Sequence, residues 1–461
     1  MFAFMPKRIP YVLALIWGAT AQAADLGELV AQAEQRDPQY QERREQALAA
    51  AENIPQAKAA LWLPRLAFTI GGNRTEQDIT ARIAPGGNSV GYFGSDYRLS
   101  LLQPVFHRDR YLQLQQADKR VQLAQLEVDT AWQALLIRVS ERYFNVLAAQ
   151  DTLSFAKAER ESLNGQLEQT RQRFDVGLVA ITDVQEAQAG FDRASAQVIT
   201  AENALENARE ALREVTGEDP TSLATLSERL SLERPEPDDI AQWTDQAVKQ
   251  NLSVAAAQKA AEVAQDDINI ASAGHYPSID IEGGQSYASR GGQFGDTQVE
   301  GGDIGIRLNV PLYEGGAVMS RTRQATHSHA ATLERLEQAR RATYRSAREA
   351  FLGVATQISA IKALKQAVVS SATALESTKA GFEVGTRTSV DVVTAERGLS
   401  QARRDLSRAR YDYVLNLLRL KQAAGTLGAE DIHRTNAWLD SAAGDATGTV
   451  PASSQGKEQA P

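Results

Sequence analysis

Two stretches of the same pattern decide the fold of this chain: residues 174–184 read FDVGLVAITDV, and residues 382–392 read FEVGTRTSVDV. Each contains a Phe-acid-Val-Gly segment followed by an Asp-Val pair, and corresponding positions lie 208 residues apart. Gly177 and Gly385 stand where a helix must end and the chain must reverse, because glycine readily adopts a left-handed backbone. The chain therefore carries two copies of one unit, each with a reversing turn.

The duplication extends well beyond the turns. Residues 103–106 read QPVF where residues 310–313 read VPLY, and Gly217 is matched by Gly425. The predicted domains are repeat 1 at 24–231 with its turn near 175–183, and repeat 2 at 232–440 with its turn near 383–391.

Long helices are predicted on both sides of each turn. After the turns, apolar residues recur at alternating steps of three and four from Val184 and from Val392, and alanine fills many seam positions. This period is typical of a coiled coil whose small residues let helices approach closely. The stretches 109–174 and 319–382 contain no proline, and at about 1.5 Å per residue each would form a rod on the order of 100 Å long. Each repeat is thus predicted to be a long antiparallel helical hairpin.

Four other segments have a period of two. Apolar and polar residues alternate from Leu66 through Phe68 to Ile70, and again from Ile304 to Leu308. Such alternation predicts strands with one apolar and one polar face. The predicted strands are 64–73, 95–106, 277–287 and 301–312, joined in pairs by Gly-, Ser- and Asp-rich loops at 73–95 and 287–302. About ten residues suffice for a tilted bilayer-crossing strand, but a small soluble sheet covering the helices remains an alternative.

A membrane position for these strands would force the chain to oligomerise. Four strands cannot close into a barrel, and an open sheet edge would leave unpaired amides in lipid. Two copies would supply about eight strands, which side chains fill, whereas three would supply about twelve, which begin to leave a lumen. Strand counting therefore favours a channel if the chain is a trimer.

The N-terminus indicates export. Lys7 and Arg8 precede an apolar run from Ile9 to Ala19, and Ala21-Gln22-Ala23 follows as a small-x-small cleavage site. This pattern predicts a signal peptide at 1–23, removed from a protein that works outside the cytoplasm. At the other end, the polar stretch 441–461 is predicted to be a flexible tail.

Composition excludes several classes of function. Lys and Arg number 49 against 58 Asp and Glu, and a net charge of −9 argues against a nucleic-acid binder. The chain has no cysteine, which rules out disulfides, thiol catalysis and N-terminal lipidation. We find no phosphate-binding loop, HExxH or GxSxG motif, and the five histidines are scattered. The sequence thus predicts no enzyme, no cofactor and no metal centre.

The duplicated turn motifs closely resemble those of the TolC family of outer-membrane channel-tunnels, as does Lys365–Ser370 before the second turn. The resemblance implies an α+β membrane protein that forms a homotrimer in the outer membrane of a Gram-negative cell. Its strands would build one 12-stranded barrel in lipid, and its coiled-coil hairpins a periplasmic tunnel. Such proteins are passive exit ducts for multidrug efflux or type I secretion, recruited by a periplasmic adaptor and an inner-membrane ABC, RND or MFS transporter, with no nucleic acid involved.

The resemblance also implies a gate of polar links at the periplasmic end, released in an iris-like movement. Arg387 matches the gate arginine, and Asp183 matches its carboxylate partner on the first repeat. Thr182 lies beside that partner, and Phe382 stands where a gate tyrosine is common. Without that hydroxyl, the gate would depend more on the pair formed by Arg387 and Asp183.

Two further sets of residues carry over from the family. Asp391 matches an aspartate that threefold symmetry would repeat as a constriction ring able to trap cations. Thr394 stands where many relatives carry a second aspartate, so cation block is expected to be weaker. The residues that match the adaptor-docking tips are Val176, Gly177, Leu178, Val384, Gly385 and Thr386.

The alternative to a channel is a periplasmic adaptor or coiled-coil scaffold without a pore. An adaptor would show one hairpin flanked by two halves of a lipoyl-like domain. This chain instead has two nearly complete copies, each with its own pair of strands, which favours the channel.

Overall fold

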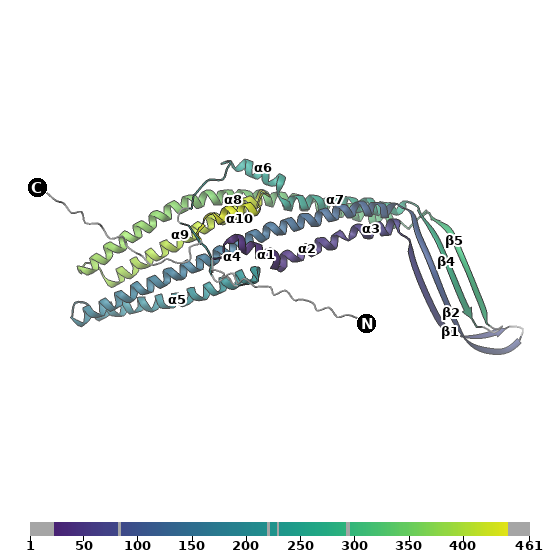
Figure 1. Ribbon diagram of the computed structural model, residues 1–461, viewed down its shortest axis with the longest axis horizontal. Helices are drawn as coiled ribbons and strands as arrows, with labels where there is room; N and C mark the ends of the chain where they lie inside the picture. Colours follow the sequence, from purple (N-terminus) through teal and green to yellow (C-terminus); the bar gives the residue numbers. More distant parts are fainter. Residues whose placement is uncertain (1–22, 82–83, 219–221, 228–229, 292–295, 441–461) are drawn as a thin grey trace, which may run out of the picture.

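The computed structural model describes residues 23–81, 84–218, 222–227, 230–291 and 296–440. Within these residues the chain is an elongated rod of helices. A β-sheet lies at one end, and the two turns that join the long helices lie at the other (Figure 1). The predicted signal peptide, apart from Ala23, and the predicted tail lie outside the described residues.

Each repeat contains one very long helix. α4 (Arg108–Asp175) has 68 residues and α8 (Ala317–Glu383) has 67. After the turns, α5 (Ile181–Thr216) packs back along α4 and α9 (Ser389–Ala423) along α8, which confirms the predicted hairpins. The shorter helices are α1 (Leu26–Arg36), α2 (Pro38–Ala51), α3 (Asn53–Trp62), α6 (Ile240–Gln250), α7 (Leu252–Ser272) and α10 (Ala429–Asn436), with a 3-10 turn at Ala273–His275.

The two reversing turns have the same hydrogen-bond pattern. Gly177 has φ +77° and Gly385 has φ +79°. The N–H of Leu178 donates to the Arg173 carbonyl at 2.8 Å, and the N–H of Thr386 donates to the Gly381 carbonyl at 2.8 Å. A left-handed glycine that closes the last helical turn in this way is a favoured helix C-terminus.

The four long strands form one antiparallel sheet in the order β1-β2-β4-β5. They are β1 (Arg65–Ala81), β2 (Ala84–His107), β4 (Ser278–Arg290) and β5 (Thr297–Asn309). The predicted loop at 73–95 is wrong, because β1 and β2 remain paired as far as Ala81 and Ala84. Small polar residues do not prevent an extended backbone, and pairing satisfies amides that a loop would leave to solvent. Residues 82–83 and 292–295 lie outside the described part.

Strand register separates an apolar from a polar face, as the alternation predicted. Leu66 pairs with Leu101 and Phe68 with Leu99 on the apolar face, where Tyr97 stacks on Tyr287 with ring centroids 5.1 Å apart. The opposite face carries the ion pair of Arg307 with Glu282 at 2.5 Å, together with residues such as Arg98 and Ser100. Within the described residues, β1 and β5 each have a neighbour on one side only.

The main hydrophobic core lies near the middle of the rod. There α4 passes α1, α5 and α9, and two short strands, β3 (Thr225–Leu226) and β6 (Leu439–Asp440), pair beside it. Tyr143 is fully buried, and its hydroxyl donates to the Ala224 carbonyl at 2.6 Å. Among the described helices, none is long and apolar enough to cross a membrane.

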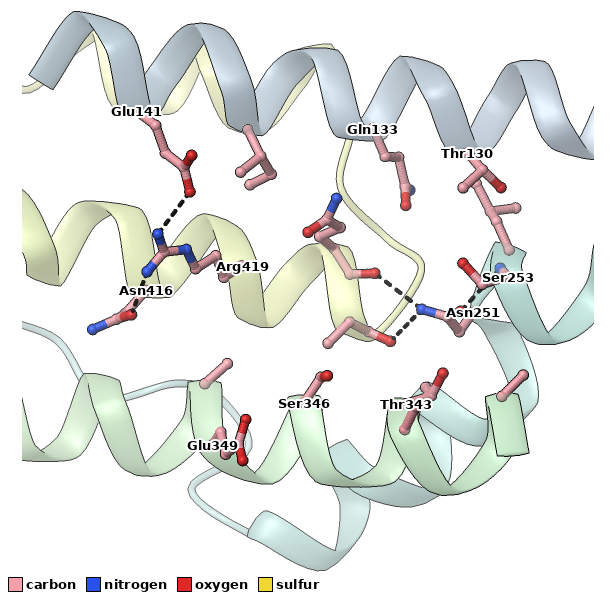
Figure 2. Close-up of a pocket in the computed structure, with 17 residues that line it drawn as sticks. Thr130, Gln133, Glu141, Asn251, Ser253, Thr343, Ser346, Glu349, Asn416 and Arg419 are labelled. Atoms are coloured by element: carbon pink, nitrogen blue, oxygen red, sulfur yellow. Dashed lines mark hydrogen bonds and ion pairs between the residues drawn. The ribbon is translucent and has the colours of Figure 1, made fainter. Parts of the chain in front are cut away.

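The end of α9 meets the start of α7 at Asn251. Figure 2 shows Asn251 beside a cavity of about 640 Å³ between α4 and α8, where α9 ends and α7 begins. Its Nδ2 donates to the carbonyls of Gln422 at 3.4 Å and Ala423 at 3.0 Å, while its Oδ1 accepts from the N–H of Ser253 at 2.9 Å. One amide therefore satisfies orphan groups of both helix ends.

We expect Asn251→Ala to destabilise the assembled protein by about 1–2 kcal/mol, because it removes an N-cap and the donor to two carbonyls. Thermal unfolding followed by circular dichroism measures the loss. Asn203→Ala is the matched control, since Asn203 on α5 is exposed and its one side-chain bond within the described part of the chain is to Asn207 of its own helix, at 2.8 Å. Equal loss in both variants would contradict the shared cap.

Candidate functional site at the hairpin tips

The residues predicted for adaptor docking lie together at the end of the rod opposite the sheet (Figure 1). Val176, Leu178 and Val384 are strongly exposed, with 70, 73 and 75% of their surface open to solvent. Both turns thus present apolar side chains outside the hairpins. Exposed apolar groups at a projecting end are suited to contact with another protein.

Asp183 and Asp391 occupy equivalent places, at the third position of α5 and of α9. The Ala180 N–H donates to the Asp183 Oδ2 at 3.1 Å, and the Thr388 N–H donates to the Asp391 Oδ2 at 2.9 Å. The Thr388 hydroxyl also donates to this Oδ2, at 3.1 Å. Both carboxylates therefore help to start the helix after the turn.

These bonds also lower the pKa of Asp391. Hydrogen bonds from the backbone and hydroxyl of Thr388 hold the pKa of Asp391 below its ordinary value, and the nearby positive charge of Arg387 adds to the effect. Our sequence reading overlooked the capping role, although Thr388 followed three residues later by Asp391 is a recognisable capping pattern.

The structure does not bring Arg387 and Asp183 together within one chain, since no ion pair joins them among the described residues. Arg387 is exposed, and its stem packs on Gly381, where an added Cβ would lie 2.7 Å from the Arg387 Cγ. Thr182 is exposed, and the Thr394 hydroxyl donates to the Val390 carbonyl of its own helix at 2.8 Å. The pair of Arg387 and Asp183 therefore remains a prediction.

Phe382 is buried at the tip by a residue that our sequence reading missed. The Arg173 guanidinium lies over the Phe382 ring, 4.7 Å from its centroid, and its Nη1 donates to the Phe382 carbonyl at 3.1 Å. Arg173 belongs to α4 and Phe382 to α8, so the contact joins the two hairpins. In the sequence, the one sign of this contact is a difference between the repeats, since Arg173 of repeat 1 aligns with Gly381 of repeat 2.

Further polar contacts follow the boundary between the two hairpins from the middle towards the tips. Arg419 bonds Glu141 at 2.6 Å, and the Tyr411 hydroxyl donates to Asp151 at 2.7 Å. Burial, with the adjacent Asp151 charge, raises the pKa of Tyr411. Nearer the tips, Arg404 lies 3.5 Å from Glu159. The two repeats are thus held side by side by a row of contacts between α4 and α9.

The family comparison agrees with the duplication seen in the fold. The family model described as "outer membrane efflux protein" matches residues 29–218 and again residues 243–426. The chain belongs to this family. It is an outer-membrane efflux and secretion channel protein, and the proteins of this family are transport ducts.

Curated relatives match almost the full chain. The outer membrane protein TolC of Vibrio cholerae is 38% identical over 94% of this chain and 99% of its own length. TolC of Escherichia coli is 35% identical over 94% of this chain and 89% of its own length. Among solved structures, the Campylobacter jejuni CmeC outer membrane channel has a TM-score of 0.73 at 14% identity, covering 95% of this chain and 98% of that one. This last likeness concerns the fold alone.

Tyr411→Phe should lower the free energy of unfolding by about 1.5–3 kcal/mol, because it deprives the Asp151 carboxylate of a buried hydroxyl donor. Urea unfolding followed by circular dichroism measures the change. Tyr344→Phe is the control, since Tyr344 is 45% exposed, and it should leave stability nearly unchanged. A Tyr411→Phe variant as stable as wild type would contradict this role.

Proposed function

We propose that three copies of the chain assemble into a passive exit duct across the outer membrane. The observation that carries this proposal is the open four-stranded sheet with an exposed apolar face, located at one end of a rod whose other end bears two exposed turns. Three such sheets would join edge to edge into about twelve strands with a lumen. The helices of the trimer would continue that lumen through the periplasm.

The proposed cargo is small molecules, secreted proteins or both. Besides the TolC relatives, the alkaline protease secretion protein AprF of Pseudomonas aeruginosa is 29% identical over 86% of this chain. The proteases secretion protein PrtF of Dickeya chrysanthemi is 27% identical over 92% of it. These names support type I secretion as one use of the duct, while the family description supports efflux.

The proposed partners are a periplasmic adaptor at the tips and an inner-membrane ABC, RND or MFS transporter. The exposed apolar residues Val176, Leu178 and Val384 would dock the adaptor, with Gly177, Gly385 and Thr386 shaping the turns. The transporter would supply energy, and the duct itself would catalyse no reaction.

The proposed gate lies at the same end. Arg387 is exposed and unpaired with Asp183 inside its own chain, so we place that pair between neighbouring chains, with Thr182 beside it. An exposed ion pair contributes only about 0–1 kcal/mol, so a docking partner is able to release three of them. Asp391, three times repeated, would form the constriction ring, without a second ring at Thr394.

Planar-bilayer recordings test the duct and its gate together. Wild-type protein should insert with low conductance, and Arg387→Ser should raise that conductance several-fold by removing the proposed link. Arg397→Ser is the matched control, because Arg397 is also exposed but lies within α9, ten residues after Arg387. If no variant inserts or conducts, the duct is wrong and the scaffold without a pore replaces it.

Cation block tests the proposed ring. Asp391→Asn should abolish block by a trivalent cation applied from the periplasmic side, because the negative ring is lost. Within one chain the hydrogen bonds from Thr388 lower the Asp391 pKa, whereas like charges brought together in the ring would act in the opposite direction.

The pH dependence of the block tests the hydrogen bond from the Thr388 hydroxyl to Asp391. Thr388→Val removes a hydrogen bond to Asp391, which raises the Asp391 pKa, so block should disappear at a higher pH than in wild type. Thr394→Val is the control, since the Thr394 hydroxyl donates to the Val390 carbonyl of its own helix and not to Asp391. Identical pH profiles for Thr388→Val and wild type would contradict this assignment.

A further inference from the structure

The two tips differ at one pair of equivalent phenylalanines. Phe174 and Phe382 stand at the same place in the two repeats, one turn before the reversing glycines. Phe174 is 39% exposed, whereas Phe382 is only 5% exposed. Since the turns have the same backbone pattern, the difference must come from what lies against each ring.

Arg173 accounts for the burial of Phe382. Its guanidinium carbon lies 4.7 Å from the ring centroid, within the range of a cation–π contact. Its Nη1 donates at 3.1 Å to the Phe382 carbonyl, which also accepts from the Gly385 N–H at 3.2 Å. Arg173 on the first hairpin therefore holds both the ring and the turn carbonyl of the second.

Among the described residues this contact occurs at one of the two tips, because the repeats differ at this position. The counterpart of Arg173 is Gly381, which has no side chain to place over Phe174. An added Cβ at Gly381 would come within 2.7 Å of the Arg387 Cγ, so the bare position also leaves room for Arg387. The two repeats therefore differ in the use of an arginine at the tip. In repeat 1 Arg173 makes a contact inside the chain, whereas in repeat 2 Gly381 leaves room for the exposed Arg387 of the proposed gate.

The surroundings support a contact that is able to open. A groove of about 210 Å³ beside Phe382 is lined mainly by polar residues of α4 and α8, namely Ser162, Gln166, Gln169, Lys379 and Glu383. Lys379 approaches Ser162 at 3.5 Å and Glu396 at 3.1 Å. Polar walls remain hydrated when the hairpins separate. Opening would therefore expose the Phe382 ring and, deeper in the same boundary, the small apolar cluster of Leu163, Ala194 and Val393.

We propose that Arg173 is a positioning residue of the gate, which acts through Phe382 to hold the two tips of one chain together while the channel is closed. This inference rests on the proposed duct function. It also explains how the tip tolerates a phenylalanine, because a guanidinium stacked on a ring needs no hydroxyl. Opening would then require the Phe382 ring to leave Arg173 in each chain, as well as release of the Arg387 links between chains.

Conductance of double variants separates the two kinds of contact. Arg173→Ala and Phe382→Leu should each raise single-channel conductance several-fold, and the double variant should open no further than either one, because both remove the same contact. Arg173→Ala combined with Arg387→Ser should open further than either alone. Arg171→Ala is the matched control, since among the described residues Arg171 bonds Glu168 and Gln188 of its own hairpin, both at 2.7 Å, and none of the other hairpin.

Arg173→Lys tests the ring contact itself, because lysine keeps the charge but loses the planar group. We expect a conductance between those of wild type and Arg173→Ala. A value equal to wild type would overturn the ring contact, since charge alone would then suffice.

A distance measurement tests the inference without relying on conduction. The chain has no native cysteine, so spin labels attached at Leu178→Cys and Val384→Cys report the separation of the two tips, with labelled chain diluted into unlabelled chain before assembly. The distribution should broaden towards longer distances in Arg173→Ala and Phe382→Leu, and remain narrow in Arg171→Ala.

The outcomes distinguish the two proposals. If Arg387→Ser opens the channel but the Arg173 variants match Arg171→Ala in both conductance and distance, the contact has no gating role and the duct stands. If no protein conducts, the duct is wrong. Broadened distances would then show that Arg173 joins the hairpins of a protein that is not a channel, which overturns its role in a gate.

Discussion

An amide in lipid must find a hydrogen-bond partner, and one chain of this protein leaves the outer sides of β1 and β5 without one among the described strands. That constraint accounts for the proposed assembly, because further copies must pair those edges while their apolar faces, with Leu66 and Phe68, contact lipid. In the proposed trimer the helices would surround the lumen that the strands enclose. Long helices such as α4 and α8 would extend that wall away from the membrane.

The duplicated chain solves equivalent problems with different residues. At the end-to-end helix junction of repeat 2, Asn251 caps both α7 and α9. At the start of α2 in repeat 1, Asp37 accepts from the Tyr40 N–H and pairs with Arg138, each at 2.7 Å. An amide supplies donor and acceptor together, whereas a carboxylate needs a separate cation. Such differences allow two similar hairpins to occupy different surroundings.

Stability is distributed unevenly along the rod. In the middle, Tyr143 and Tyr411 are buried and hydrogen-bonded, and dense apolar packing surrounds them. Near the tips the hairpins meet through a few polar contacts, the buried ring of Phe382 and the small apolar cluster of Leu163, Ala194 and Val393. A firm middle with weakly joined ends suits a gate that a partner opens, because separating the tips does not disturb the core.

Local patterns in the sequence determined the elements: left-handed glycines at 177 and 385 end helices, steps of three and four give coiled coils, and alternation gives strands with two faces. The same patterns, with the family resemblance, located the tip residues. Only the tertiary structure decided the full length of β1 and β2, the double cap at Asn251, and the contact of Arg173 with Phe382. Each depends on residues far apart in the chain, whose packing no local period records.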